Sequence, residues 1–327
     1  MDLKFKKPSK ETRITMSKVA IGEDKEDYSK IAEEKLCNLT NHNECKLVNS
    51  GNAAILTAMN SIEGAILIPD QGAWNGFKQI ANFLNKEIIT IKTNQGLIEI
   101  NHLEDAINNT INNKELLSNN QNALFLTSFA AYTAEQNIKE ISKFCHENNI
   151  LLVEDASGAI SDSSKKLANG NCSDIIIGST GSPKIVNVGY GGFITTNNTN
   201  VFDKSKLILK TSKINNIIAT GISTELDFAK ENLNKTLKAC DYLKNNLNNV
   251  IHQDKRGINV ILSSEDKSLS FNLRNEFKLD NHGMITKCPN YNRLKEKGVA
   301  IEIKNLNTSC LSKDNLDEII NIVNYYC

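Results

Sequence analysis

Lys184 has the most distinctive chemical setting in this sequence, because it lies in a segment rich in glycine and hydroxyl side chains between positions 178 and 193. An unprotonated lysine amine that is held in place can attack an aldehyde and form an imine. The glycines would let the backbone approach a large planar ligand, and serine hydroxyls could hold a phosphate group. The segment therefore predicts that Lys184 binds an aldehyde covalently.

Three other positions could take part in the same chemistry. Asp155 follows an apolar segment 29 residues before Lys184, and Ser50 and Gly51 precede an apolar pattern of helical period. The amides at the start of such a helix can hold a phosphate. Taken singly, each signal also has an ordinary explanation, because a lysine in a Gly/Ser loop is usually solvated and an aspartate after a strand is usually a cap. Their order along the chain favours a common site.

The elements that must position these residues alternate between strand and helix. Helices are expected at 24–39, from 51, at 74–84, from 102 and from 136. Apolar segments predict strands at 46–48, 65–69, 88–91, 123–127, 150–154, 174–178 and 192–196. Strands that are apolar on both faces and separated by helices predict an α/β fold with a doubly wound, mostly parallel sheet. Ligands of such sheets bind beyond the carboxyl ends of the strands.

The C-terminal part of the sequence has shorter elements. A helix is expected at 224–247, followed by strands at 257–263, 268–273 and 299–303 and by a final helix that Ser312 caps. These patterns predict a large domain over 1–248, which includes an N-terminal helical segment, and a small α+β domain over 249–327. The asparagine-rich segment 108–122 is expected to include an exposed loop.

Composition excludes several classes of protein. The 327 residues carry 38 basic and 38 acidic side chains, so no broad basic surface predicts binding to nucleic acid or to an anionic membrane. No apolar segment of 18 residues occurs. Eight scattered cysteines without a CxxC pair, and five dispersed histidines, predict neither a metal site nor a disulfide framework. A cytoplasmic location is the expectation.

Taken together, the motifs resemble those of fold-type I pyridoxal-phosphate enzymes of the aspartate aminotransferase superfamily, and they are most similar to the DegT-type aminotransferase family. The resemblance covers about 31–197 and implies pyridoxal 5'-phosphate as cofactor. It assigns the cofactor phosphate to the Ser-Gly turn at Ser50, Gly51 and Asn52. It also implies that Trp74 stacks on the pyridine ring.

The same resemblance assigns the remaining roles in the cofactor site. Asp155 in Glu154-Asp155-Ala156 would pair with the pyridine nitrogen, Ser179 would help to hold the phosphate, and Lys184 would form the internal aldimine. An aspartate in that position keeps the ring nitrogen protonated, so that the ring can accept electrons from the substrate's α-carbon. Lys184 would then act as the base that moves the proton.

Two departures from the family pattern concern the cofactor. Asn52 stands where the family usually has a threonine, and Ser157-Gly158-Ala159 stands where a glutamine usually follows the aspartate. That glutamine normally contacts the ring hydroxyl. A nucleotide P-loop does not fit the lysine segment, because Pro183 occupies the position where that motif requires glycine.

Substrate binding is expected to involve arginine, which is rare in this chain. The superfamily commonly uses a small-domain arginine to grip the substrate carboxylate, so Arg293 and Arg274 are the candidates. The resemblance implies a homodimer that transfers an amino group from a small-molecule donor to a keto acceptor. Two alternatives remain open: elimination or sulfur transfer on an amino acid, with Cys288 as a sulfur carrier, and a non-catalytic relative of the fold.

Overall fold

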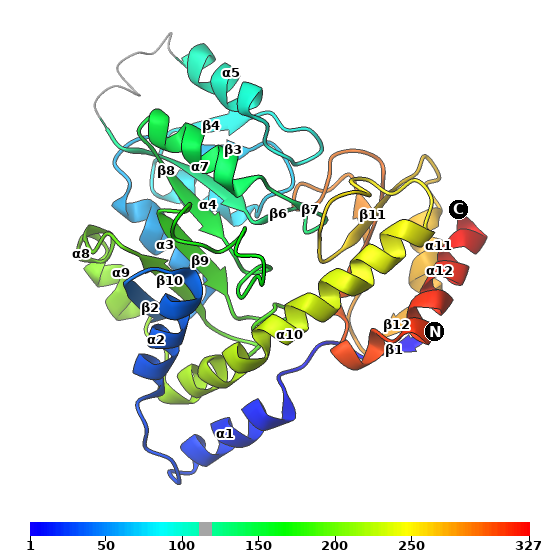
Figure 1. The fold of residues 1–327 in the computed structure, drawn as a ribbon, viewed down its shortest axis with the longest axis horizontal. Helices are drawn as coiled ribbons and strands as arrows, with labels where there is room; N and C mark the ends of the chain where they lie inside the picture. Colours follow the sequence, from blue (N-terminus) through cyan, green and yellow to red (C-terminus); the bar gives the residue numbers. More distant parts are fainter. Residues whose placement is uncertain (111–119) are drawn as a thin grey trace.

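A seven-stranded sheet forms the centre of the large domain in a computed structural model, which describes residues 1–110 and 120–327 (Figure 1). Its strands, in spatial order, are β2 (Glu44–Val48), β10 (Gly192–Thr196), β9 (Ile175–Ser179), β8 (Ile150–Asp155), β5 (Asn122–Thr127), β3 (Ile66–Pro69) and β4 (Ile88–Ile91). All paired neighbours are parallel except β10, which runs antiparallel to both β2 and β9. The expected doubly wound, mostly parallel sheet is confirmed.

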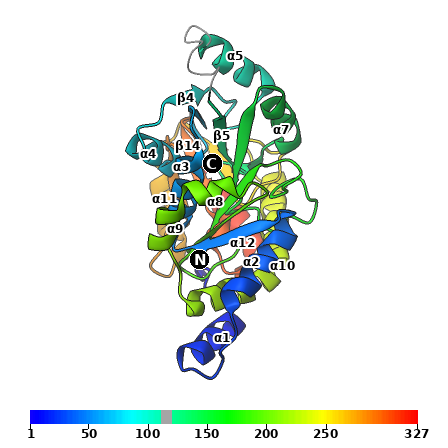
Figure 2. The same ribbon diagram turned by 90° about the vertical axis from the view of Figure 1, so that its left-hand side faces the viewer.

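Helices cover both faces of this sheet (Figure 2). One face packs against α2 (Tyr28–Thr40), α5 (Ile100–Thr110), α7 (Ile138–Glu147) and the first half of α10 (Asn216–Asn246). The other packs against α3 (Gly51–Ser61), α4 (Gly76–Phe83) and α8 (Asn200–Lys204), and α9 (Lys206–Thr211) lies against α3. Within β5, Leu124 and Leu126 belong to the first core, whereas Ala123 and Phe125 belong to the second. Successive side chains of a strand point to opposite faces, which explains why the central strands are continuously apolar.

The second half of α10 leads into a small lobe. The lobe contains a three-stranded antiparallel sheet in the order β11 (Val260–Ser263), β14 (Gly298–Ile301) and β13 (Ile285–Cys288). It also contains α11 (Leu269–Glu276), α12 (Lys313–Tyr326) and the short 3₁₀ turns η2 (Ile303–Asn305) and η3 (Thr308–Cys310). The short strand β12 (Lys278–Leu279) pairs in parallel with β1 (Asp2–Leu3), at the opposite end of the chain.

The core of the small lobe therefore draws on three separate parts of the sequence. Leu3 and Phe5 pack with Leu243 of α10 and with Val260 and Ile319. The division predicted between residues 248 and 249 falls just after the end of α10. Residues that lie on the large-domain side of that division thus contribute to the core of the lobe.

One predicted element is wrong. Positions 268–273 form the start of helix α11 and not a strand. The apolar residues at 269, 271 and 273 suggested alternation, but Phe271 is 65% exposed while Leu269 and Leu273 are buried. Residues four apart lie on one face of a helix, and here that face packs into the small-lobe core.

Helix α10 begins at Asn216, eight residues before the expected start. Its first turns contain β-branched residues and Gly221, which favour helix weakly. A Cβ on residue 221 would lie 2.6 Å from a methyl carbon of Val188 and 2.8 Å from the sulfur of Met16, so the glycine permits close packing there. Met16 belongs to α1 (Lys10–Ala20), which packs along α10. Tertiary contacts thus extend the helix beyond what its composition predicts.

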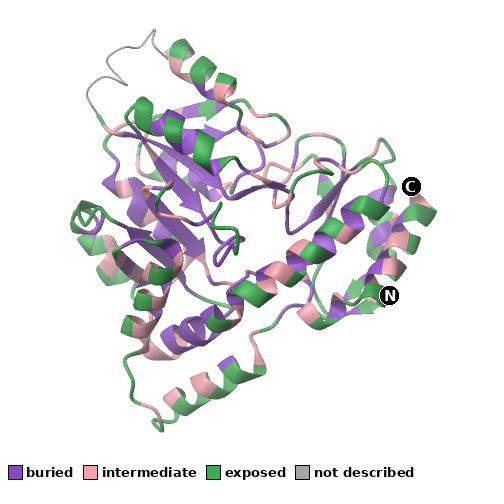
Figure 3. Ribbon diagram, viewed as in Figure 1, coloured by how far each residue is buried: buried purple, intermediate pink, exposed green. Residues whose placement is uncertain are grey.

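Burial follows this layered arrangement, with the strands buried and the outer helix faces exposed (Figure 3). Ser312 caps α12 as expected, because its hydroxyl accepts a hydrogen bond from the Asn315 amide. Most of the asparagine-rich segment lies outside the described residues. Among the described helices, none is long and apolar enough to cross a membrane.

Candidate active site

A cleft of about 400 Å³ lies where the carboxyl ends of β2, β8 and β9 meet the small lobe. Each predicted site residue except Arg274 lines it: Ser50, Gly51, Asn52, Trp74, Asp155, Ser179, Lys184 and Arg293. The parallel strands bring their carboxyl ends to the same edge, so residues far apart in the sequence meet in one cleft. The motifs follow one another along the sequence, and the fold brings them together in a single site.

The amino end of α3 forms one wall of the cleft. Ser50 is the N-cap, and its hydroxyl accepts a hydrogen bond from the Ala53 amide at 3.1 Å. A Cβ on Gly51 would lie 2.7 Å from the Cβ of Ser179, so only glycine allows the helix to approach the end of β9 this closely. Free amides and the helix dipole favour an anion at this end. Ser182 lines the same cleft and adds a hydroxyl.

Trp74 follows β3 and supplies an aromatic surface in the cleft. Its indole is 37% exposed, and its Nε1 donates a hydrogen bond to Asn52 Oδ1 at 3.0 Å. A Cβ on Gly76 would overlap the indole, so the ring depends on that glycine for its place. The hydrogen bond gives Asn52 a structural role beside the anion-binding helix end.

Asp155 ends β8 and is nearly buried, with 8% exposure. Its Oδ1 accepts hydrogen bonds from the Ser157 amide at 2.9 Å and from the Ser157 hydroxyl at 2.5 Å. Its Oδ2 accepts none from the part of the chain that the structure describes. Asp155 therefore keeps one carboxylate oxygen available for a cationic group in the cleft.

Lys184 lies in the β9–β10 connection, and its Nζ donates a hydrogen bond to the Tyr132 hydroxyl at 3.0 Å. Burial lowers the pKa of Lys184, but the opposing effects of Tyr132 and Asp155 are together larger, so the pKa is raised. In the free protein the amine is thus held as an ammonium. A cation placed against Asp155 would weaken one of the two interactions that keep the Lys184 amine protonated.

The small lobe contributes two cations and one carboxylate. Arg293 makes a two-point ion pair with Glu302, through Nε at 2.7 Å and Nη2 at 2.9 Å. Lys304 Nζ lies 3.2 Å from the same carboxylate. Arg293 and Lys304 both line the cleft, and their combined charge exceeds that of Glu302. The lobe therefore presents a net positive surface to whatever binds beside Lys184.

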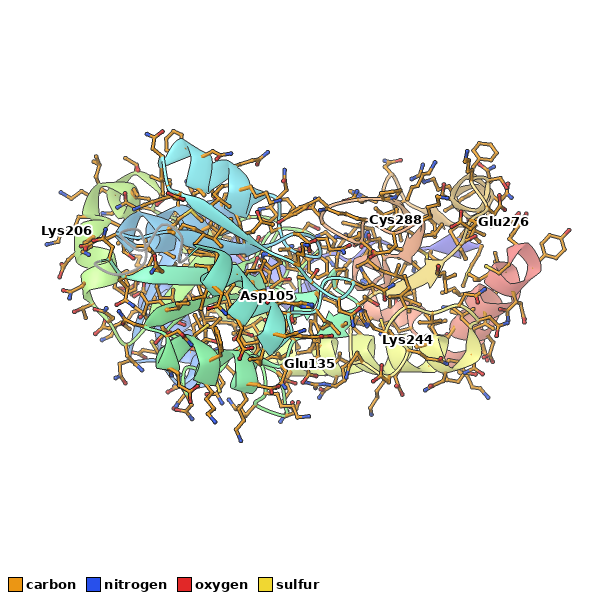
Figure 4. The ribbon with its side chains drawn as sticks, turned by 90° about the horizontal axis from the view of Figure 1, so that it is seen from above. Asp105, Glu135, Lys206, Lys244, Glu276 and Cys288 are labelled. Carbon is orange, nitrogen blue, oxygen red and sulfur yellow. The ribbon has the colours of Figure 1, made fainter. Side chains whose placement is uncertain are left out.

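Arg274 and Cys288 do not line the cleft. The Nε of Arg274 donates to the Ile285 carbonyl at 3.3 Å within the small lobe. Cys288 lies in β13 of the same lobe (Figure 4), and burial raises the pKa of its thiol. A buried thiol with a raised pKa is a poor nucleophile. Its position gives no support to a sulfur-carrying role.

The cleft residues that were not predicted from the sequence as parts of the site include Tyr132, Ser157, Asn292 and Lys304. Ser157 could have been found from its position two residues after Asp155, where a short hydroxyl can reach back to a carboxylate. No local pattern marks Tyr132, Asn292 or Lys304. These three side chains reach the cleft because of the way in which the two lobes pack together.

Comparison with known proteins gives the family of this chain. The profile of the DegT/DnrJ/EryC1/StrS aminotransferase family matches residues 18–251. The chain belongs to this family. It is accordingly a pyridoxal-phosphate-dependent transferase, and the resemblance inferred from the motifs is confirmed. A profile named MJ1341 family C-terminal domain matches residues 230–324.

Solved structures share the fold at low sequence identity. Helicobacter pylori PseC, an aminotransferase involved in the biosynthesis of pseudoaminic acid, is 14% identical with a TM-score of 0.77, over 100% of this chain and 99% of its own. A DegT DnrJ EryC1 StrS aminotransferase from Brucella abortus is also 14% identical, with a TM-score of 0.70, over 96% and 95%. Sphingomonas wittichii serine palmitoyltransferase is 11% identical, with a TM-score of 0.74, over 100% and 86%.

The cleft of this DegT-family protein fits pyridoxal phosphate group by group. The amino end of α3 provides an anion site, to which Ser179 and Ser182 can add hydroxyls. Asp155 has an uncommitted carboxylate oxygen for the ring nitrogen, and the Trp74 indole offers a face for the ring. Lys184 lines the same cleft, and its amine would be available to the aldehyde.

Proposed function

We propose that this protein is an aminotransferase that converts a small-molecule amine to a ketone while a keto acceptor becomes an amine. The cofactor, when bound, supplies the electron sink for bond breaking at the substrate's α-carbon. The observation that carries this proposal is the presence of Lys184, Asp155 and the amino end of α3 in one cleft of about 400 Å³.

Each residue has a separate task in this proposal. Asp155 holds the protonated ring nitrogen, and the start of α3 with Ser179 binds the phosphate. Lys184 would hold the aldehyde, and its free amine would act as the base that takes a proton from the substrate's α-carbon and gives it back to the substrate. Because Lys184 is close to Tyr132, its amine stays in the cleft when it is released.

The cations of the small lobe are proposed to bind the substrate's anionic group. Arg293 was expected to do so, and its Nη1 and Nη2 still have N–H groups beyond those used for Asn292 and Glu302. Lys304 is a second cation on the same side of the cleft. A carboxylate is the group that such a pair of cations would recognise. Arg274 has no part in this proposal, because it does not line the cleft.

The protein is further proposed to act as a homodimer, as the family resemblance implies, and to be located in the cytoplasm. All eight cysteines are free thiols, which fits a reducing compartment. Sedimentation of the purified protein at several concentrations would measure the assembly, and a persistent monomer would contradict the dimer.

The aminotransferase proposal can be tested by absorbance spectroscopy. Adding pyridoxal phosphate to the purified protein should produce a visible absorbance band that the variant Lys184→Ala lacks. Lys210→Ala, which changes an exposed lysine outside the cleft, is the matched control and should keep the band. A full band in Lys184→Ala would contradict the role of Lys184. Absence of a band in the wild type would indicate a non-catalytic relative.

The reaction itself requires a second assay. The loaded protein is mixed with candidate amino donors in the absence of an acceptor, and the products are measured. Transfer predicts one equivalent of keto product per site, with the amino group retained. Release of free ammonia or sulfide over many turnovers would instead show elimination or sulfur transfer, and the aminotransferase proposal would fail.

A further inference from the structure

Tyr132 lies in a strained turn between the short strands β6 (Phe129–Ala130) and β7 (Ala134–Glu135). Two successive residues of this turn, Ala131 and Tyr132, have φ values of +53° and +63°. Side chains disfavour this left-handed region, and glycine or asparagine would fit it better. Strain of this kind is often associated with a functional site, and it persists only when its surroundings hold it in place.

Groups from the small-lobe side hold this turn. The Tyr132 carbonyl accepts hydrogen bonds from the Ile258 amide at 2.8 Å and the Asn259 amide at 3.0 Å. The Thr133 carbonyl accepts one from Lys244 Nζ at 2.7 Å, on the second half of α10 (Figure 4). The turn has an internal hydrogen bond from the Thr133 amide to the Ala130 carbonyl at 2.8 Å, and these tertiary donors fix the Tyr132 and Thr133 carbonyls in addition.

The turn places the Tyr132 side chain between the two lobes. Its hydroxyl is 3.0 Å from Lys184 Nζ. The ring centre is 4.9 Å from the Arg293 guanidinium carbon and 5.0 Å from Lys304 Nζ. Cations at these distances are attracted by the aromatic face. The ring is thus held on the small-lobe side, while its hydroxyl reaches the amine of the large domain.

We propose that Tyr132 is a positioning residue for Lys184: its hydroxyl oxygen accepts a hydrogen bond from the lysine ammonium, stabilises the protonated amine and keeps it directed into the cleft. This inference rests on the proposed function, in which Lys184 must gain and release a proton beside the substrate. In this proposal the turn brings the hydroxyl to Nζ, and a relaxed turn would withdraw it.

The charges around Lys184 determine what loss of the hydroxyl would do. Burial lowers the pKa of Lys184 and the nearby Arg293 also lowers it, whereas Tyr132 and Asp155 raise it. Lys304 is a further cation on the same side of the cleft. Removing the Tyr132 hydroxyl takes away one of the two interactions that raise the pKa of Lys184. The amine should then lose its proton at a lower pH.

The variant Tyr132→Phe isolates this effect, because it keeps the ring, its cation contacts and the turn while it removes a single oxygen. Tyr325→Phe is the matched control, since Tyr325 is 81% exposed in α12 and lies outside the cleft. Circular dichroism and thermal denaturation would establish that both variants are folded. Tyr132→Leu, which also removes the ring, separates the contribution of the hydroxyl from that of the cation contacts.

The decisive measurement needs no cofactor. Brief labelling of the cofactor-free protein with acetic anhydride over a pH series, followed by peptide mass spectrometry, gives the pH midpoint for Lys184 reactivity. The midpoint should move to lower pH in Tyr132→Phe and Tyr132→Leu and remain unchanged in Tyr325→Phe. An unchanged midpoint in folded Tyr132→Phe would overturn the proposal.

The turnover of the loaded enzyme provides a second measurement. Loss of a hydrogen bond to a charged group should lower kcat about 10-fold in Tyr132→Phe, with a smaller change in KM. Failure of the proposed function would instead appear as an unaltered absorbance band in Lys184→Ala. The labelling midpoint does not depend on that band, so the two failures are distinguishable.

Discussion

The Ser157 hydroxyl donates a hydrogen bond to Asp155 Oδ1 at 2.5 Å, and no other described side chain does so. The same hydroxyl accepts a hydrogen bond from the Ser179 amide at 2.8 Å. One serine therefore connects the carboxylate proposed for the ring nitrogen with the strand end proposed for the phosphate. It stands within the segment where the family usually has a glutamine, and its contacts stabilise the arrangement of the cleft.

Replacing this serine should weaken cofactor binding. In Ser157→Ala, Asp155 loses a hydrogen bond to a charged oxygen and the Ser179 amide loses its acceptor. We expect the dissociation constant for pyridoxal phosphate to rise about 10- to 100-fold. Titration followed by absorbance would measure it. Ser163→Ala is the control, because Ser163 is exposed and its hydroxyl bonds only to Asn234 among the described residues. Equal affinities in both variants would contradict the role of Ser157.

Trp74 is the only tryptophan in the sequence, so all tryptophan emission from this protein comes from the cleft. A bound ligand that absorbs in the near ultraviolet and lies against the indole should quench that emission. We expect emission to fall in a saturable way as pyridoxal phosphate is added. Trp74→Phe should abolish the signal while a cofactor absorbance band remains. Unchanged emission from a protein with the cofactor bound would place the ring elsewhere.

Lys304 should make substrate binding depend on pH. Burial lowers the pKa of Lys304 to about 8, although Glu302 opposes this effect. The side chain is therefore charged below about pH 8 and neutral above it, so an anionic substrate loses an attraction as pH rises. KM should increase through this range, and Lys304→Met should raise KM about 10-fold at pH 7 and flatten the profile. Lys238→Met, on an exposed helix face, should retain the wild-type profile.

Glu302 should contribute stability that is lost in acid. Burial raises the pKa of Glu302, but Lys304 and Arg293 together lower it by more than burial raises it. The pKa in the folded state is therefore below the pKa in the unfolded state. The stabilisation is present above the unfolded value of about 4.3 and declines as pH falls below it. Glu302→Gln leaves two buried cations without their carboxylate, which should cost about 3–5 kcal/mol.

Urea denaturation at pH 7 and at pH 4 would measure this contribution. The same comparison at pH 3 extends the series, and the difference between wild type and Glu302→Gln should be large at pH 7 and smaller at pH 3. Glu265→Gln alters an exposed pair with Lys297 and should change stability by less than about 1 kcal/mol. A loss in Glu302→Gln no larger than in this control would contradict the buried ion-pair assignment.

The sequence predicted the residues whose signals are local. Ser50, Asp155 and Lys184 each lie at or just after a strand end, and apolar strands flanked by helices are visible in the amino-acid order. Their convergence follows from parallel strands alone. Tyr132 and Lys304 could not be found in this way, because they are 172 positions apart and meet only when the lobes pack.

The elements of the small lobe were harder to predict for a related reason. The alternation over 268–273 suggested a strand, whereas Leu269 and Leu273 pack as one helical face because the lobe core lies on that side. Strand β13 was not predicted, since its sequence at Ile285–Cys288 is short and only partly apolar. Short elements give weak periodicity, and tertiary packing decides their conformation.

The pairing of β1 with β12 has a consequence for synthesis of the protein. Asp2 and its partner Lys278 are separated by 276 positions, so the ribosome makes one strand long before the other. The large domain can form its sheet while translation continues, but the small lobe must wait. Arg293 and Lys304 are also made late. The cleft can therefore be completed only after Lys304 has been made, later than the residues of the sheet that line it.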